Sequence, residues 1–228
     1  MAVTFDAANS VDSGTGAVDT LSFSLTIAAD ANHVVVGVMI RNRGAVTVNT
    51  VTVGGVGCTQ RQSAEEATTT VFADMWDLHS PSTGAQTVEV VLSSTKRFVI
   101  GAVSLKNVDA TTPRGTPQIG TGTSQVAAAA TVTSATDELV VDVVAKQNNT
   151  EAISVGASQT QRVNDNTTNA TEGNNVIGGM STEPGAASVD MTWTWTTTNR
   201  PWASVAIPFK PTVAAGTVSS RMMLMGVG

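Results

Sequence analysis

The chain has 228 residues, a net charge of −6 and only 13% charged residues, and it contains one cysteine. The acidic balance excludes a protein that binds nucleic acid through phosphate contacts, because no basic stripe is present. A single Cys58 excludes an intramolecular disulfide and a cysteine-based zinc site. No apolar run approaches the roughly 20 residues of a membrane span, and the N-terminus lacks a signal-peptide pattern. We therefore expect a soluble protein made in a cytoplasm.

Strand patterns follow one another along the first half of the chain. Leu21 to Ile27 alternates apolar and polar residues, which indicates a strand with one face buried. His33–Ile40 and Arg97–Leu105 are almost continuously apolar, which is typical of strands covered on both faces. Val46–Val53 alternates but changes phase near Asn49, which predicts a bulge or turn there. Further strands are expected at 3–5, 57–62, 69–78 and 87–92.

The second half repeats this order after a Thr-, Gly- and Pro-rich connector at 108–123. Leu139–Ala145 matches the strand at His33, and Arg200–Phe209 matches the strand at Arg97. Thr160-Gln161-Arg162 follows Thr59-Gln60-Arg61 by 101 residues. The steady offset predicts an internal duplication of about 100 residues, with pseudo-repeats at 18–107 and 121–210.

Many short strands separated by turn signals, and no convincing helical period, predict an all-β, jelly-roll-like β-sandwich over residues 1–210. Two sandwiches side by side and one sandwich with interleaved strands are both compatible with a duplication. We favour a single compact unit, because the connector contains Ile119 and is short for a free linker.

Side chains that could carry out catalysis are few. His33 and His79 lie in no metal-binding or nucleophile motif, and a surface position at a strand end is expected for each. Asp74 and Asp77 would point to opposite faces of a strand, so they cannot form the converging acid pair of a glycosidase. We expect a polar outer face there, no catalytic residue, no cofactor and no metal.

Two features suggest contact with sugars. The segment Asn164–Asn175 is the most polar stretch of the chain, and we expect a mobile, exposed loop. Candidate glycan-binding residues are Asn164, Asp165 and Asn166, together with an exposed Trp202. Trp193 and Trp195 share a face with apolar residues and are expected in the core.

The segment 211–228 loses strand character and ends in an apolar run after Arg221. Exposed apolar patches mark interaction sites, and methionine adapts to irregular grooves. We expect this segment to be an extended docking tail that binds a neighbouring subunit. Its candidate docking residues are Met222, Met223, Leu224, Met225 and Val227.

Several segments carry a resemblance: VTFDAANS, HVVVGVMIRN, VTVGGVGCTQR, FVIGAVSLKNVDATTPRGTP and LVVDVVA. In this order they resemble a family of Thr-, Val- and Gly-rich β-sandwich proteins encoded by tailed bacteriophages and some bacteria. The similarity covers about residues 3–209, and its most telling part is VSLKNVDATTP. No catalytic motif accompanies it.

The resemblance implies a non-enzymatic virion protein that is assembled in the host bacterial cytoplasm. It would decorate the capsid as a cement protein or belong to the neck or tail. Its partners would be other virion proteins, with a homo-oligomer such as a trimer expected and no nucleic-acid or membrane partner. The alternative is a carbohydrate-binding appendage that recognises a host surface glycan.

Overall fold

The structure is a computed structural model that describes residues 1–68, 70–123, 126–128, 131–148, 151–196 and 199–212. In these ranges the chain is all-β, with one short 3₁₀ helix, η1 (Glu172–Asn174). Antiparallel sheets pack as sandwiches, which confirms the predicted fold class. The tail residues predicted to dock, from Met222 to Val227, lie outside the described residues.

The first half of the chain builds two sheets that share the long strand β8 (Gly84–Lys106). Residues 97–106 of β8 pair with β1 and β3 in what we call the first inner sheet. Its other strands are β1 (Thr4–Asp12), β3 (Ala31–Arg41), β7 (Val71–His79) and β6 (Thr59–Glu65). Residues 84–92 of β8 pair with β2 and β4 in the first outer sheet. It contains β2 (Val18–Ile27), β4 (Val48–Val53) and β5 (Val56–Gly57).

The second half forms its own two sheets. The second inner sheet has the order β13-β14-β11-β16-β9, and the second outer sheet the order β10-β15-β12. The inner strands are β13 (Thr160–Asn166), β14 (Asn175–Pro184), β11 (Leu139–Asn148), β16 (Trp202–Phe209) and β9 (Gln118–Gly122). The outer strands are β10 (Val126–Ala128), β15 (Thr192–Thr194) and β12 (Ser154–Val155).

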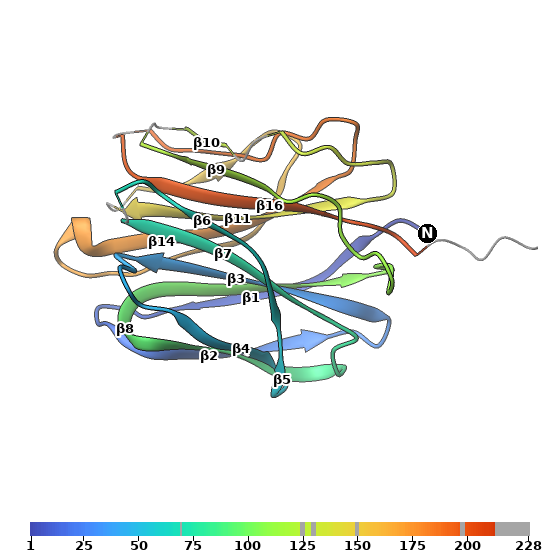
Figure 1. Cartoon of the computed structure of the whole chain (residues 1–228), viewed down its shortest axis with the longest axis horizontal. Helices are drawn as coiled ribbons and strands as arrows, with labels where there is room; N and C mark the ends of the chain where they lie inside the picture. Colours follow the sequence, from blue (N-terminus) through green and yellow to red (C-terminus); the bar gives the residue numbers. More distant parts are fainter. Residues whose placement is uncertain (69, 124–125, 129–130, 149–150, 197–198, 213–228) are drawn as a thin grey trace, which may run out of the picture.

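The four sheets are stacked as layers, from β2 and β4 at one side to β10 at the other (Figure 1). Because strand side chains alternate between faces, β3 serves two cores. Val34, Val36 and Val38 pack toward the first outer sheet, whereas Val35 and Met39 belong to the core between the two inner sheets. The chain thus forms two sandwiches that lie face to face, with their strands hydrogen-bonded mainly within each half.

Both inner sheets follow the same strand order. β1-β8-β3-β7-β6 in the first corresponds to β9-β16-β11-β14-β13 in the second. Both also carry a register shift at a matched place, between Gln60 and Gln62 and between Gln161 and Val163. This correspondence is consistent with the predicted duplication, which stays a prediction.

Three details differ from the sequence patterns, and a fourth confirms one of them. Residues 84–106 form one strand rather than two, and the expected bulge in β4 is confirmed between Val48 and Thr50. The connector contains a strand, β9, which pairs with β16. Most of β14 has no counterpart among the predicted strands, although it lies between β13 and β11 in the second inner sheet.

Candidate functional site

A network of five ionisable side chains lies where the two sandwiches meet. We call it the joint cluster, and it comprises His33, Arg61, Asp77, His79 and Arg114. His33 and Asp77 are buried, with 0% and 1% exposure. His33 lies opposite His79 in the β3–β7 ladder, Arg61 comes from β6, and Arg114 comes from the connector next to Phe209. The cluster therefore links three strands of the first inner sheet to the segment that leads into the second half.

Asp77 is the centre of this cluster. Its Oδ2 lies 3.0 Å from Nε2 of His33, and its Oδ1 accepts a hydrogen bond of 2.5 Å from Nε of Arg61. Arg114 also donates to Oδ2. The second ring nitrogen of His33, Nδ1, lies 3.2 Å from Nδ1 of His79. The expectation that both histidines are surface residues is wrong for His33, because its ring contacts Asp77 and Phe209 and is fully buried.

The charges of the cluster are balanced by these contacts. Burial by itself would raise the pKa of Asp77, but the hydrogen bonds from His33 and Arg61 and the charge of Arg114 outweigh it and lower that pKa. Burial lowers the pKa of His33, against the opposing effect of Asp77. The ionised Asp77 can only accept hydrogen bonds, so Nε2 of His33 carries the hydrogen between them.

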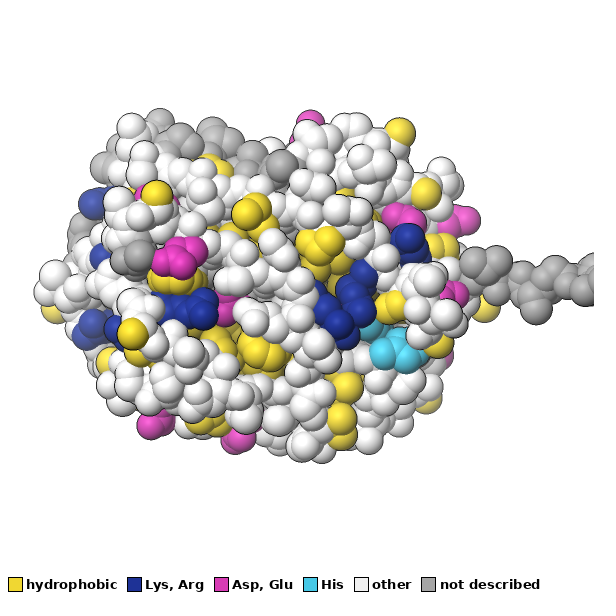
Figure 2. Space-filling view, viewed as in Figure 1, with side chains coloured by type: hydrophobic (Ala, Val, Ile, Leu, Met, Phe, Trp, Pro, Cys, Tyr) yellow, Lys and Arg dark blue, Asp and Glu magenta, His cyan; other side chains and the backbone are white. Residues whose placement is uncertain are grey.

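A His–Asp pair also occurs in hydrolytic triads, where the free ring nitrogen receives a proton from a nucleophile. Here Nδ1 of His33 is occupied by His79 instead, and the ring packs against Phe209 with centroids 5.1 Å apart. The His33 ring therefore connects β3 to β7, through His79, and to β16, through Phe209. The space-filling view shows histidine atoms beside a group of basic side chains at the molecular surface (Figure 2).

Asp74 and Asp77 do not form the polar outer face that the sequence suggested. Asp74 is 0% exposed and accepts a 2.5 Å hydrogen bond from Ser63 Oγ, with Arg43 at 3.4 Å. Burial raises the pKa of Asp74. The two carboxylates have separate partners, as expected for opposite strand faces. Both are buried because β7 is covered on both sides.

Another buried carboxylate, that of Asp142, lies in the second half of the chain. Asp142 on β11 accepts hydrogen bonds from the backbone N–H of Ser181 at 2.8 Å and from Nε1 of Trp193 at 2.7 Å. Burial raises its pKa to about 7, although these donors oppose the shift. Asp142 thereby connects the second inner sheet to the tryptophan-rich core under the second outer sheet.

The candidate glycan-binding residues are not brought together. Trp202 is only 6% exposed and packs in a cluster with Trp193 and Trp195, so the prediction of an exposed Trp202 is wrong. It lies on β16, which is separated from β13 by two strands. The prediction that Trp193 and Trp195 are core residues is confirmed, since both are buried.

The polar segment 164–175 is held to the body of the protein. Asn164 Nδ2 donates to the carbonyl of Ile153 at 3.1 Å, and Asp165 accepts from Ser10 at 3.0 Å. Asn166 Nδ2 donates to the carbonyl of Thr167. Asn164 and Asn166 remain exposed, while their amide groups contribute to local structure. This segment contains the end of β13 and η1 rather than a single loop.

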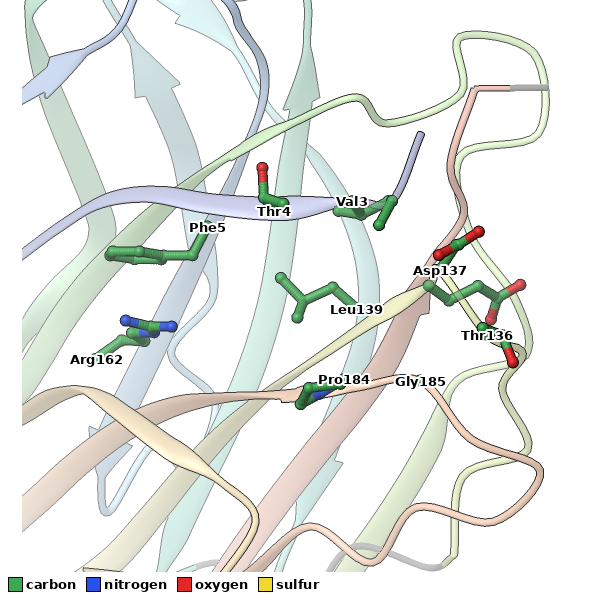
Figure 3. Close-up of a pocket in the computed structure, with 11 residues that line it drawn as sticks. Val3, Thr4, Phe5, Thr136, Asp137, Leu139, Arg162, Pro184 and Gly185 are labelled. Atoms are coloured by element: carbon green, nitrogen blue, oxygen red, sulfur yellow. The ribbon is translucent and has the colours of Figure 1, made fainter. Parts of the chain in front are cut away.

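A pocket of about 440 Å³ opens near the N-terminus, between β1 and the ends of β11 and β14. Leu139 lies between Val3 and Phe5 on one side and the facing Pro184 on the other (Figure 3). Asp137 borders one end of the pocket and Arg162 the other. We call it the terminal pocket. Its lining is mainly apolar, which is typical of a site that binds an apolar ligand or peptide segment.

Asn107 ties both described ends of the chain together beside this pocket. Its side-chain amide donates to the carbonyl of Ala2 at 2.9 Å, and its own carbonyl accepts from the N–H of Thr212 at 2.9 Å. Asn107 adopts a positive φ of 61°, a conformation that asparagine tolerates better than most residues. Nothing in the sequence singled out Asn107, which was included only within the VSLKNVDATTP segment that carries the resemblance.

No known protein family, curated protein or solved structure matches the chain. Within the described ranges, no group of three or more His, Cys, Asp or Glu side chains is arranged to hold a metal ion. The described part of the chain also contains no helix long and apolar enough to cross a membrane.

Proposed function

We propose that the protein is a structural component of a tailed-bacteriophage virion, most simply a capsid decoration protein that acts by binding. The observation that carries the proposal is the position of the segment VSLKNVDATTP, on which the resemblance mainly rests. In the structure this segment leaves β8 and connects the two sandwiches. It also holds both described ends of the chain.

The contacts of this segment support a rigid anchor for the residues that follow. The N–H of Asp109 donates to the carbonyl of Lys210, and the N–H of Thr212 to the carbonyl of Asn107. Val108 forms a bridge with Pro211 and is fully buried. Thr212, the last described residue, is therefore hydrogen-bonded to the four-layered body, and residues 213–228 follow it in the sequence. An apolar segment with such a root is suited to attach the body to a neighbouring subunit.

Repetition would make weak attachments effective. On a capsid lattice each copy contacts several neighbours, and linked weak contacts combine into strong attachment. The alternative, a carbohydrate-binding appendage, loses its predicted aromatic platform because Trp202 is buried.

The test is co-sedimentation with capsids of the phage or prophage whose genome encodes the chain. We expect saturable binding with a copy number that matches a lattice site, and loss of binding when residues 213–228 are removed. Arg43→Ala serves as a control on a side chain remote from residues 107–113. Absence of the full chain from purified capsids, necks and tails would contradict the proposal.

A further inference from the structure

We propose that the terminal pocket binds the Arg221–Met225 segment of the same chain, folded back onto its own body. This inference concerns the free protein and goes beyond the proposed function, because it assigns a receptor site and a resting position to the terminal segment. It rests on four observations: the apolar lining of the pocket, the position of Thr212 beside it, the length of the linker that follows Thr212, and the charge of Arg221.

The terminal pocket is an open end of the core between the two inner sheets. Val3 and Leu139 belong to that core, with 4% and 8% exposure, and Phe5 packs against it. An apolar side chain placed over Leu139 would therefore extend a core that already exists. Burying such a side chain is favourable because apolar surface leaves water.

The root of the segment lies next to the pocket. Ala2 lines the pocket, and a single residue, Asn107, hydrogen-bonds both Ala2 and Thr212. Nine residues, 213–221, separate Thr212 from Met222. Extended chain covers roughly 3.3–3.6 Å per residue, so this linker spans on the order of 30 Å. It can turn and return to the pocket with length to spare.

The composition of the segment matches the lining. Met222, Met223, Leu224 and Met225 form an unbroken apolar run. Methionine fills irregular gaps and makes favourable contacts between its sulfur and an aromatic ring, and Phe5 supplies such a ring. Arg221 precedes the run and would lie near the carboxylates of Asp137 and Glu138 at one end of the pocket. Arg162, stacked 3.7 Å over Phe5, borders the other end.

Binding within one chain is favoured over binding between copies. A short flexible linker gives an effective concentration in the millimolar range, which exceeds the concentration of a second copy in a micromolar solution. Because Thr212 lies close to the pocket, the segment that occupies it is expected to come from the same chain.

The experiment is NMR of the full chain with ¹³C-labelled methionine methyl groups. The chain has eight methionines, of which Met39, Met75, Met180 and Met191 are fully buried and serve as internal references for folding. We expect the methyl signals of Met222, Met223 and Met225 to be displaced from random-coil positions. We also expect cross-peaks to the Phe5 ring, with both features unchanged on tenfold dilution.

Two variants keep this test clear of folding defects, because both changed residues come after β16, the last described strand, in the sequence. Leu224→Asp should return the three methyl signals to random-coil positions, and Arg221→Glu should weaken docking several-fold, more strongly at low salt. A peptide of residues 213–228 should bind the chain ended at Thr212, and should bind the full chain at least tenfold more weakly.

Random-coil signals in the full chain would overturn the inference. So would docking that disappears on dilution while sedimentation shows a dimer, since the occupant would then be a second copy. Neither result depends on capsid binding, so failure of the proposed function and failure of this inference are separately visible.

Discussion

Met39 on β3 packs directly against the backbone of Gly178 on β14, so that a β-carbon on Gly178 would lie 2.6 Å from Met39 Cε. The same β-carbon would lie 2.9 Å from Cβ of Val99. The two inner sheets thus approach each other at a position that has no room for a side chain. The close contact makes the two sandwiches one packed body.

Gly178→Ala should destabilise the protein by about 1–3 kcal/mol, the usual cost of overpacking a core. The matched control is Gly57→Ala, where an added β-carbon meets nothing within 4 Å, and we expect a change within about 0.5 kcal/mol. Urea unfolding of both variants measures the difference. Equal stability of the two variants would show that the inner sheets are not in close contact at Gly178.

Asp77→Asn should cost about 3 kcal/mol, the lower end of the range for breaking a buried ion pair. The lower end applies because Arg61 and Arg114 keep 28% and 21% of their side chains exposed and can return to water. The exposed Asp19→Asn is the control, with a change within about 0.5 kcal/mol. The free energy of unfolding in urea measures both, and a loss below 1 kcal/mol for Asp77→Asn would contradict a structural role for the joint cluster.

Asp142 should make the protein less stable as the pH rises from about 4 to 7. Its pKa is about 7 in the folded protein and about 3.9 in an unfolded chain. In this window the folded state binds more protons than the unfolded state, so the free energy of unfolding falls with rising pH.

Asp142→Asn should remove this contribution to the pH slope, because an amide does not titrate. The substitution also disturbs the bond from Trp193, so the slope, not the absolute stability, is the quantity to compare. His33, whose pKa is lowered, gives an opposite slope below its unfolded value near 6.5, and this slope is present in both proteins and cancels in the difference. Identical slopes from urea unfolding at pH 4, 5, 6 and 7 would refute the assignment.

Trp202→Ala should destabilise the protein by about 3–5 kcal/mol, as expected for truncating a buried aromatic side chain. Trp202 pairs with Gly122 across β16 and β9, and a β-carbon on that glycine would lie 3.0 Å from the indole. Ile119→Ala, on the same neighbouring strand and 43% exposed, should cost less than about 1 kcal/mol. Thermal or urea unfolding checks both. If Trp202→Ala left the stability unchanged, the burial of Trp202 would be contradicted and an exposed, glycan-binding Trp202 would again be a candidate.

Local patterns were sufficient to predict the fold class and many of the strands. The alternation at Leu21–Ile27 and the apolar run at Phe98–Leu105 are properties of the residues themselves, and both strands are observed. The phase change near Asn49 predicted a real bulge. These features are readable because strand periodicity depends only on neighbours along the chain.

Only the tertiary structure showed that β14 is a strand, that the side chains of the joint cluster come together, and that Trp202 is buried. Gly178 and Gly179 belong to no strand predicted from the sequence. They nevertheless lie in β14 of the second inner sheet, where Met39 and Trp193 pack against their backbone from its two faces. His33 is buried because β7 and the connector bring Asp77 and Arg114 to it. The sequence by itself determined those strands that have a clear apolar pattern, such as Leu21–Ile27 and His33–Ile40. Which faces meet depended on side-chain volume and charge at residues far apart in the chain, and periodicity carries no information about those.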